Sequence, residues 1–434
     1  ELEVGLGLVV SRGAGKAKTV VVHSRFSQLG RRKIAQAMAK LGVGVVRHTR
    51  LLGVDFSAGK KVKRSVQRAR INKVCSRRRR YRQVGGKAAR HLVKTGAGPG
   101  LRYGSAVYGA TNSAIKIVRS FSYNAIGEMR GKSTFARLVL ANYDAGGLMA
   151  IDPIVHWARA VFDRLVSRDD MRISWKAAMV KVAGAERPFG AVCGPAGAMV
   201  ASARRIGWKV PSPFHIMMEE GSLISLDEIA PSDLRMLAAR ALHHKDAPLS
   251  SLAQRTGVTP DLEPLRSFLG TIRRTKAAAS LRALGEGGWW TQARMCEAGM
   301  VGVEDDLCKV CHDQIGDLYH RCCGCPGLSK AFKEGAKHQE ILGVAQSALR
   351  YKDPLFQHGF PELQKPLPPP AFVQRWCGGR SIDDFQFTGN VFSDGSVHVG
   401  GSKGHERAGW AAVVVNDEGE VVGGAYGTCP DHFP

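Results

Sequence analysis

Short apolar runs alternate with polar turns over the first 55 residues, which is the pattern of β-strands. Val4–Ser11 and Thr19–His23 predict two strands joined by a glycine-containing turn. Arg25–Leu41 has the composition of a helix, and Val43–Asp55 predicts a return to strand. Segment 1–55 is therefore expected to mix strands with one helix.

Helical spacing of apolar positions dominates the chain beyond residue 56. The stretch 60–98 predicts a helix with one packed, irregular apolar edge and a wide polar face. Between residues 121 and 288, helical patterns are separated by short glycine and proline breaks. Two helices that follow prolines are predicted over Ala196–Ile206 and Leu234–His243.

The pattern changes again towards the C-terminus. Trp289-Trp290 opens a cysteine-rich stretch, and both indoles are expected to be core because tryptophan is heavily buried on average. A helix and a stiff proline-rich linker are predicted to follow. The chain then predicts three strands, with a hairpin turn between the second and third: Phe387–Val399, Gly409–Asn416 and Glu420–Gly427.

These patterns together predict an α+β fold with several domains. A chain of 434 residues, 44% of them hydrophobic, is long and apolar enough to bury more than one core. We expect a mostly helical middle, a small cysteine-rich module and a three-stranded C-terminal sheet. The predicted segments are 1–55, 56–120, 121–288, 289–340, 341–385 and 386–434.

Positive charge is concentrated in the first quarter of the chain. The formal net charge is +26; residues 1–100 hold 25 Lys and Arg against Glu1, Glu3 and Asp55, which gives 25 − 3 = +22. Such a field attracts a polyanion, although a solubilising face or a localisation signal would use the same residues. We therefore expect RNA, DNA or an RNA–DNA hybrid to be the partner. The predicted contacts are Lys60, Lys61, Lys63, Arg64, Arg68, Arg77, Arg78, Arg79, Arg80 and Arg82.

Two other classes of function find no support in the sequence. Gly13–Lys16 is similar to a phosphate-binding loop, but Val10 stands where that motif needs glycine and Ala17 where it needs Ser or Thr. No apolar run reaches the ~18 residues of a membrane span, and the start at Glu1 is not a signal peptide. We expect an intracellular protein, nuclear, cytoplasmic or both. The missing methionine indicates a fragment or a processed N-terminus.

Six of the ten cysteines and two histidines lie within thirty residues. In the pattern Cys308-x2-Cys311-x8-His320-x4-Cys325, the first pair can hold a zinc ion from a tight turn, and the His and Cys can complete a tetrahedron. Four protein ligands leave no open position, so the site would be structural. The alternative is a redox-sensitive or merely cysteine-rich loop. Other candidates for the fourth ligand are Cys322, Cys323 and His312.

Asp394 interrupts the first predicted strand of the C-terminal sheet. An acidic residue in an apolar strand is costly unless it is exposed or binds something, and carboxylates hold Mg²⁺ at phosphoryl-transfer sites. The same residues are equally compatible with a two-residue hairpin turn at Asp394-Gly395.

At these strands the sequence resembles a known family. Asp394-Gly395-Ser396, Gly409–Val414 and Gly423–Gly427 resemble the opening three strands of a type 1 ribonuclease H domain. The resemblance implies that Asp394 matches the first-strand aspartate that helps to bind catalytic magnesium. The other acidic residues of that family would lie beyond Pro434.

Upstream segments resemble the neighbouring parts of a non-LTR (LINE-type) retrotransposon polyprotein, in the same order. Cys308–Cys325 is similar to the zinc-binding module between polymerase and ribonuclease H. Gly7–Ser11 with Lys18–Val21 is similar to the stretch after the catalytic turn of reverse transcriptase. Arg50–Val54 is similar to the hairpin that grips the primer end, and Leu101–Gly104 to the thumb and connection region.

The resemblance covers roughly 1–120 and 289–434, and it implies the end of a reverse transcriptase with its basic thumb, a zinc module and a truncated ribonuclease H domain. The parent would copy RNA into DNA and cut RNA in hybrids, with magnesium. This chain is expected to be catalytically incomplete, because it contains no Tyr-x-Asp-Asp motif. Two other interpretations remain: a non-enzymatic zinc-containing nucleic-acid binder or degenerate retroelement relic, and a ribosome-associated basic protein.

Overall fold

The computed structural model describes most of the chain between residues 64 and 364 and shorter pieces on either side. The chain forms two compact units. The first unit is built from Glu1–Gly127, Ala145–Met217 and Ile224–Ala239, and the second from Glu128–Asp144, Met218–Leu223 and Arg240–Pro434. The described residues are 20–22, 36, 39–40, 44–46, 48–51, 54–57, 64–126, 133–272, 276–300, 305–327, 340, 342–345, 347, 353–364, 375–377, 390–398 and 407–428.

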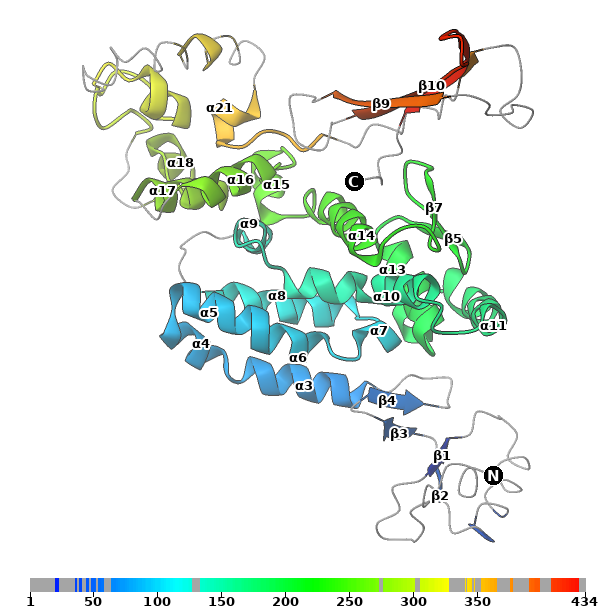
Figure 1. Cartoon of the computed structure of the whole chain (residues 1–434). Coiled ribbons are helices and arrows are strands. Elements are labelled where there is room, and N and C mark those ends of the chain that lie inside the picture. The colour runs from blue at the N-terminus through cyan, green and yellow to red at the C-terminus, as the bar shows by residue number, and fades with distance from the viewer. Residues whose placement is uncertain are drawn as a thin grey trace. The chain divides into compact units, whose positions relative to one another are not determined.

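One helix, α10 (Ala145–Phe162), forms the centre of the first unit (Figure 1). Thirteen of its 18 residues are buried, because apolar and small side chains occupy nearly its whole surface. It packs against α6 (Gly98–Arg102), α7 (Ser105–Tyr108), α8 (Asn112–Ile126) and α13 (Pro195–Arg205).

The basic stretch forms three short helices rather than the single predicted one. The chain turns after Cys75 and again at Gly85, whose φ of 65° favours glycine. All three helices lie against α8 (Figure 1). They are α3 (Ser65–Cys75), α4 (Arg78–Val84) and α5 (Gly86–Leu92).

The predicted helices over Ala196–Ile206 and Leu234–His243 are confirmed by α13 and by α14 (Pro231–Asp246). Between them lies a three-stranded sheet that helical spacing does not predict. Its strands are β5 (Lys209–Ser212), β6 (His215–Met217) and β7 (Leu223–Ser225). The first unit also contains four short helical segments that precede α13 in the chain: η1 (Val93–Ala97), α11 (Arg168–Ala178), η2 (Met179–Ala183) and α12 (Pro188–Ala191).

The N-terminal strands are confirmed in part. β1 (Val20–Val22) falls within the predicted Thr19–His23 and pairs in parallel with β2 (Gly44–Val46). β3 (His48–Leu51) and β4 (Val54–Ser57) form an antiparallel pair. The predicted strand Val4–Ser11 and most of the predicted helix Arg25–Leu41 lie outside the described residues.

A buried ion pair fixes α6 and α7 to the central helix. Arg102 donates from Nε and Nη2 to the Asp152 carboxylate at 2.9 and 2.5 Å, and Ser105 donates its hydroxyl to the same carboxylate at 3.0 Å. Asp152 is only 3% exposed. Its charge is therefore stable in the core only because three hydrogen bonds replace water.

Arg102→Met is expected to destabilise the first unit by about 3 kcal/mol or more, because it leaves the Asp152 carboxylate buried without its cation. Chemical denaturation measures the free energy of unfolding. Arg159→Met, at an exposed position on α10, is the matched control. An Arg102→Met effect no larger than that control would show that the ion pair does not hold these helices.

The second unit has its own apolar core beneath α9 (Thr134–Leu140). Leu140, Leu252, Leu269 and Phe360 pack together there. Arg137 also reaches this interior, where its guanidinium donates to Glu286 at 3.2 Å. Three helices pack against α9 around this core: α15 (Ser251–Thr256), α16 (Glu263–Thr271) and α17 (Lys276–Gly285). The second unit also contains α18 (Gln292–Glu297) and α21 (Pro354–His358).

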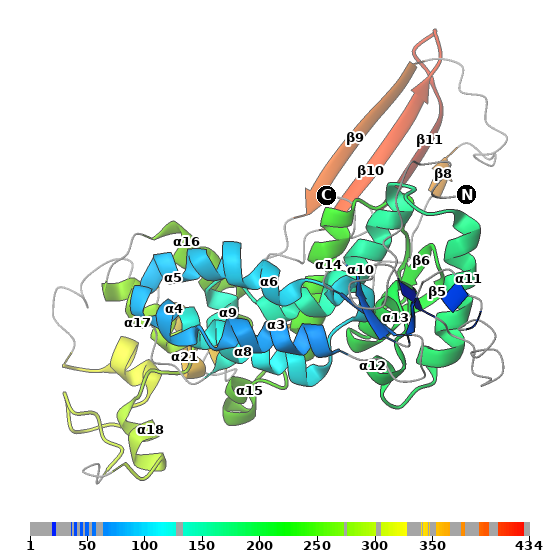
Figure 2. The same cartoon turned by 90° about the horizontal axis from the view of Figure 1, so that it is seen from below.

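The three predicted C-terminal strands are confirmed and form an antiparallel sheet (Figure 2). The strand order is β8-β11-β10-β9, where β8 (Arg375–Cys377) is a fourth strand that was not predicted. Asn416 and Gly419 close the expected turn between the last two strands. The long strands are β9 (Asn390–His398), β10 (Arg407–Val415) and β11 (Val421–Thr428).

No single helix in the described ranges has the length and apolar character needed to cross a bilayer; one bent pair, α9 with α10, passes that test on length and composition alone.

Candidate metal centre and candidate nucleic-acid interface

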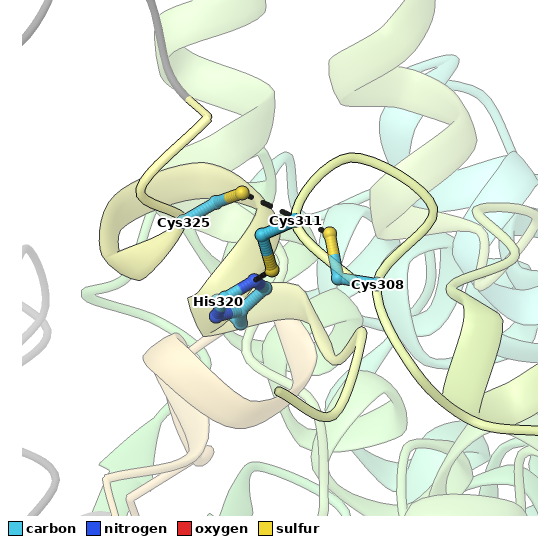
Figure 3. A group of neighbouring side chains, drawn as sticks. All are labelled: Cys308, Cys311, His320 and Cys325. Atoms are coloured by element: carbon cyan, nitrogen blue, oxygen red, sulfur yellow. Dashed lines mark hydrogen bonds between the residues drawn. The ribbon is translucent and has the colours of Figure 1, made fainter. Parts of the chain in front are cut away.

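The four residues of the predicted zinc pattern converge in the second unit (Figure 3). The ligand atoms of Cys308, Cys311, His320 and Cys325 all lie within 4.8 Å of one another. Sγ of Cys308 lies 3.8 Å from Sγ of Cys325, and Sγ of Cys311 lies 3.1 Å from Nε2 of His320. Among the described residues, this is the one group of three or more His, Cys, Asp or Glu side chains that could hold a metal ion.

The two N-terminal cysteines are placed by a short hairpin-like loop. Leu307 and Ile315 form an antiparallel bridge, and the backbone N–H of Cys308 donates to the carbonyl of Gln314 at 2.8 Å. Gly316 is buried at the end of this loop. A Cβ there would lie 2.8 Å from Cβ of Gln292, so only glycine allows the loop to close onto α18.

His320 and Cys325 come from one short helical segment, η3 (His320–Gly324), and the residue after it. Asp317 caps this segment, because its carboxylate accepts from the backbone N–H of His320 at 2.7 Å. The N–H of Cys325 then donates to the carbonyl of His320 at 2.7 Å. Loop and helical segment therefore present two ligands each, as the spacing predicts.

The surroundings of the sulfur atoms favour thiolates at two of the three cysteines. Burial raises the pKa of Cys308, but backbone N–H groups of Cys311 and Val310 outweigh it and hold that pKa below its ordinary value. The backbone N–H of Asp313 likewise lowers the pKa of Cys311. Burial raises the pKa of Cys325, and the neighbouring sulfurs add to the increase.

This arrangement fits a tetrahedral zinc ion. With Zn–S bonds of about 2.3 Å, a regular tetrahedron has S···S edges of roughly 3.8 Å, and Cys308 and Cys325 are separated by that distance. The edge between Cys311 and His320 would have to lengthen by roughly half an ångström. A dication would also favour the thiolate form of all three cysteines. With four protein ligands, a bound zinc ion would have no open position for a substrate.

The alternative ligands do not belong to the group. Cys322 and Cys323 lie within the helical segment and His312 lies in the loop, but none of them has its ligand atom among the four. Burial raises the pKa of both extra cysteines, which favours the neutral thiol.

Trp289 and Trp290 were predicted to be core residues, but both are only half-buried. The Arg294 guanidinium lies over the Trp290 ring, 4.5 Å from its centroid.

Of the ten predicted nucleic-acid contacts, six are exposed, one is engaged within the first unit and three lie outside the described residues. Arg68, Arg77–Arg80 and Arg82 are exposed on α3, at the turn after it and on α4. Helix α4 is anchored to α8 by Tyr81, whose ring meets that of Phe121 edge-on at 5.6 Å. The ion pairs found among the described residues include none of these arginines. Lys60, Lys61 and Lys63 lie outside the described residues.

Arg64 differs from the other predicted contacts. Its guanidinium donates to the carbonyls of Tyr108 and Phe189 at 2.8 and 2.6 Å. Burial lowers its pKa from the ordinary value. Arg70 is also engaged within the protein, since it stacks on Tyr103 at 4.6 Å and donates to the carbonyl of that residue. Both arginines hold the first unit together, which the run of basic residues does not reveal.

Asp394 is exposed and lies in the middle of β9, opposite Ala411 on β10. It is therefore not in a hairpin turn, and the strand interpretation of this residue is confirmed. No other carboxylate joins it in a metal-binding group within the described part of the chain.

No protein-family model, curated protein or solved structure matches this chain.

The purified protein is expected to contain about one zinc per chain, and Cys308→Ser/Cys311→Ser is expected to contain almost none, because two of four ligands are lost. Elemental analysis measures the metal content. Cys322→Ser/Cys323→Ser is the matched control and should keep its zinc. Equal zinc in the wild type and the first double variant would exclude these residues as ligands.

Proposed function

We propose that this chain binds nucleic acid through the exposed arginines of α3 and α4, and that a structural zinc ion shapes the module around Cys308–Cys325. The observation that carries the proposal is the charge of residues 56–127. They include 18 Lys and Arg and not one Asp or Glu. A segment with such an excess of cations attracts phosphate chains, and each phosphate that it neutralises releases condensed counterions.

The side chains on this face favour contact with the backbone of the nucleic acid over contact with its bases. Tyr81 is the only Phe, Tyr or Trp in α3–α5, and its ring is used against Phe121. Binding to single strands relies on exposed aromatic rings that stack on bases. Arginines without such rings grip phosphates, which gives affinity with little sequence preference.

We further propose that the chain is part of a retrotransposon polyprotein with reverse transcriptase and ribonuclease H activities. Three features support this: the order of the motifs, the Cys308–Cys325 group, and the sheet of β9, β10 and β11, in which Asp394 lies on β9. Asp394 would then contribute one carboxylate to a magnesium site. A two-metal site needs several carboxylates, so this chain supplies binding surface rather than complete catalysis.

Replacing Arg77, Arg78, Arg79 and Arg80 by Gln is expected to weaken binding to an RNA–DNA hybrid and to reduce the salt dependence. If each arginine neutralises one phosphate, the slope of log K against log salt should fall by roughly 3 to 4. Fluorescence anisotropy at several salt concentrations measures both quantities.

The matched control removes four exposed cations elsewhere in the first unit: Arg159, Lys176, Lys181 and Arg187. It should leave the slope nearly unchanged. If both quadruple variants lose the same affinity, only net charge matters and the α3–α4 face is not the contact. A wild-type affinity that does not depend on salt would rule out phosphate contact altogether.

The chain is expected not to cleave the RNA strand of a hybrid in the presence of Mg²⁺, because Asp394 is its only match to the acidic residues of ribonuclease H. A labelled hybrid separated on a denaturing gel measures cleavage. Magnesium-dependent products that disappear in Asp394→Asn would contradict the expectation and show a complete catalytic site.

A further inference from the structure

One residue outside the four ligands contacts both halves of the metal centre. The backbone carbonyl of Gln314 accepts from the N–H of Cys308 at 2.8 Å, which holds the loop. Its side-chain Oε1 lies 3.0 Å from Nδ1 of His320, the ring nitrogen that faces away from the cysteines. The other ring nitrogen, Nε2, lies 3.1 Å from Sγ of Cys311.

The chemistry of imidazole makes the side-chain contact selective. A neutral histidine that binds a metal through Nε2 carries its proton on Nδ1, and this N–H needs an acceptor. Oε1 of Gln314 is an acceptor and lies at hydrogen-bond distance. The opposite tautomer would place a lone pair against Oε1 and a proton where the metal binds, so it is disfavoured.

We propose that Gln314 is a positioning residue of the metal centre, which accepts a hydrogen bond from Nδ1 of His320 and thereby holds Nε2 as the metal ligand. The inference rests on the proposed zinc site and adds a residue that the cysteine and histidine spacing does not contain. Asp317 does not perform this role, because its carboxylate accepts from the backbone N–H of His320 and not from the ring.

Three substitutions separate the role of an acceptor from that of a space-filling side chain. Gln314→Glu keeps an acceptor on a side chain of similar length. Gln314→Met keeps the length but removes the strong acceptor, and Gln314→Lys presents only donors. All three preserve the backbone carbonyl that holds Cys308, so the loop itself is retained.

Zinc affinity is measured on the full chain by competition with a chromophoric chelator. Gln314→Glu should bind zinc at least as tightly as the wild type. Gln314→Met should bind about tenfold more weakly, and Gln314→Lys up to about a hundredfold more weakly, as expected when the group that orients a ligating histidine is lost. Asp313→Asn is the control for charge, since this exposed neighbour loses a carboxylate without touching the His320 ring.

Circular dichroism at saturating zinc checks that each variant is folded. Rescue by Glu together with loss in Met and Lys supports the role of the acceptor. Equal affinities in all variants, or equal losses in Glu and Met, would overturn it. If the wild type itself binds no zinc, the proposed metal centre fails; if the wild type binds zinc and the Met and Lys variants bind it equally well, only the role of Gln314 fails.

Discussion

The structure of the first unit depends on how the positive charges of residues 56–127 are accommodated, because this segment contains no carboxylate of its own. Residues 56–127 cannot neutralise their 18 Lys and Arg with local acids. The fold engages some of them through partners distant in sequence: Arg64 with the carbonyls of Tyr108 and Phe189, and Arg102 with the buried carboxylate of Asp152. Arg70 is held by the ring and carbonyl of Tyr103. The exposed arginines of α3 and α4 are Arg68, Arg77–Arg80 and Arg82, and solvent and salt weaken the repulsion between them. A phosphate chain is the partner proposed for this face.

The segment that carries the metal centre has too few buried side chains to form an apolar core of its own. Residues 305–327 form mainly loop, with one short helical segment, and few of their side chains are buried. Short backbone hydrogen bonds bring the four ligand atoms together, and Gly316 allows the loop to approach α18. Zinc would join the loop to the helical segment and so supply the cross-link that a small apolar core cannot. We therefore propose that the metal would serve the folding of the second unit, and that the charge of the first unit would serve binding.

Local patterns predicted local features well. The cysteine and histidine spacing identified the four residues that converge, the turn at Asn416–Gly419 identified the last hairpin, and Pro231 marked the start of α14. Features that depend on distant partners could not be predicted in this way. In the sequence Arg64 cannot be distinguished from a surface cation, because its partners, the carbonyls of Tyr108 and Phe189, lie 44 and 125 residues away. Strands of three or four residues, such as those of the β5–β7 sheet, are too short to show a period against helical surroundings.

Hydrogen exchange with and without an RNA–DNA hybrid distinguishes a binding role of α3 and α4 from one of the zinc module. Exchange detected by mass spectrometry reports protection of backbone amides along the chain. If α3 and α4 bind the hybrid, exchange slows in residues 65–84 and stays unchanged in residues 305–327. Protection confined to residues 305–327, with none in α3 and α4, would contradict this binding role.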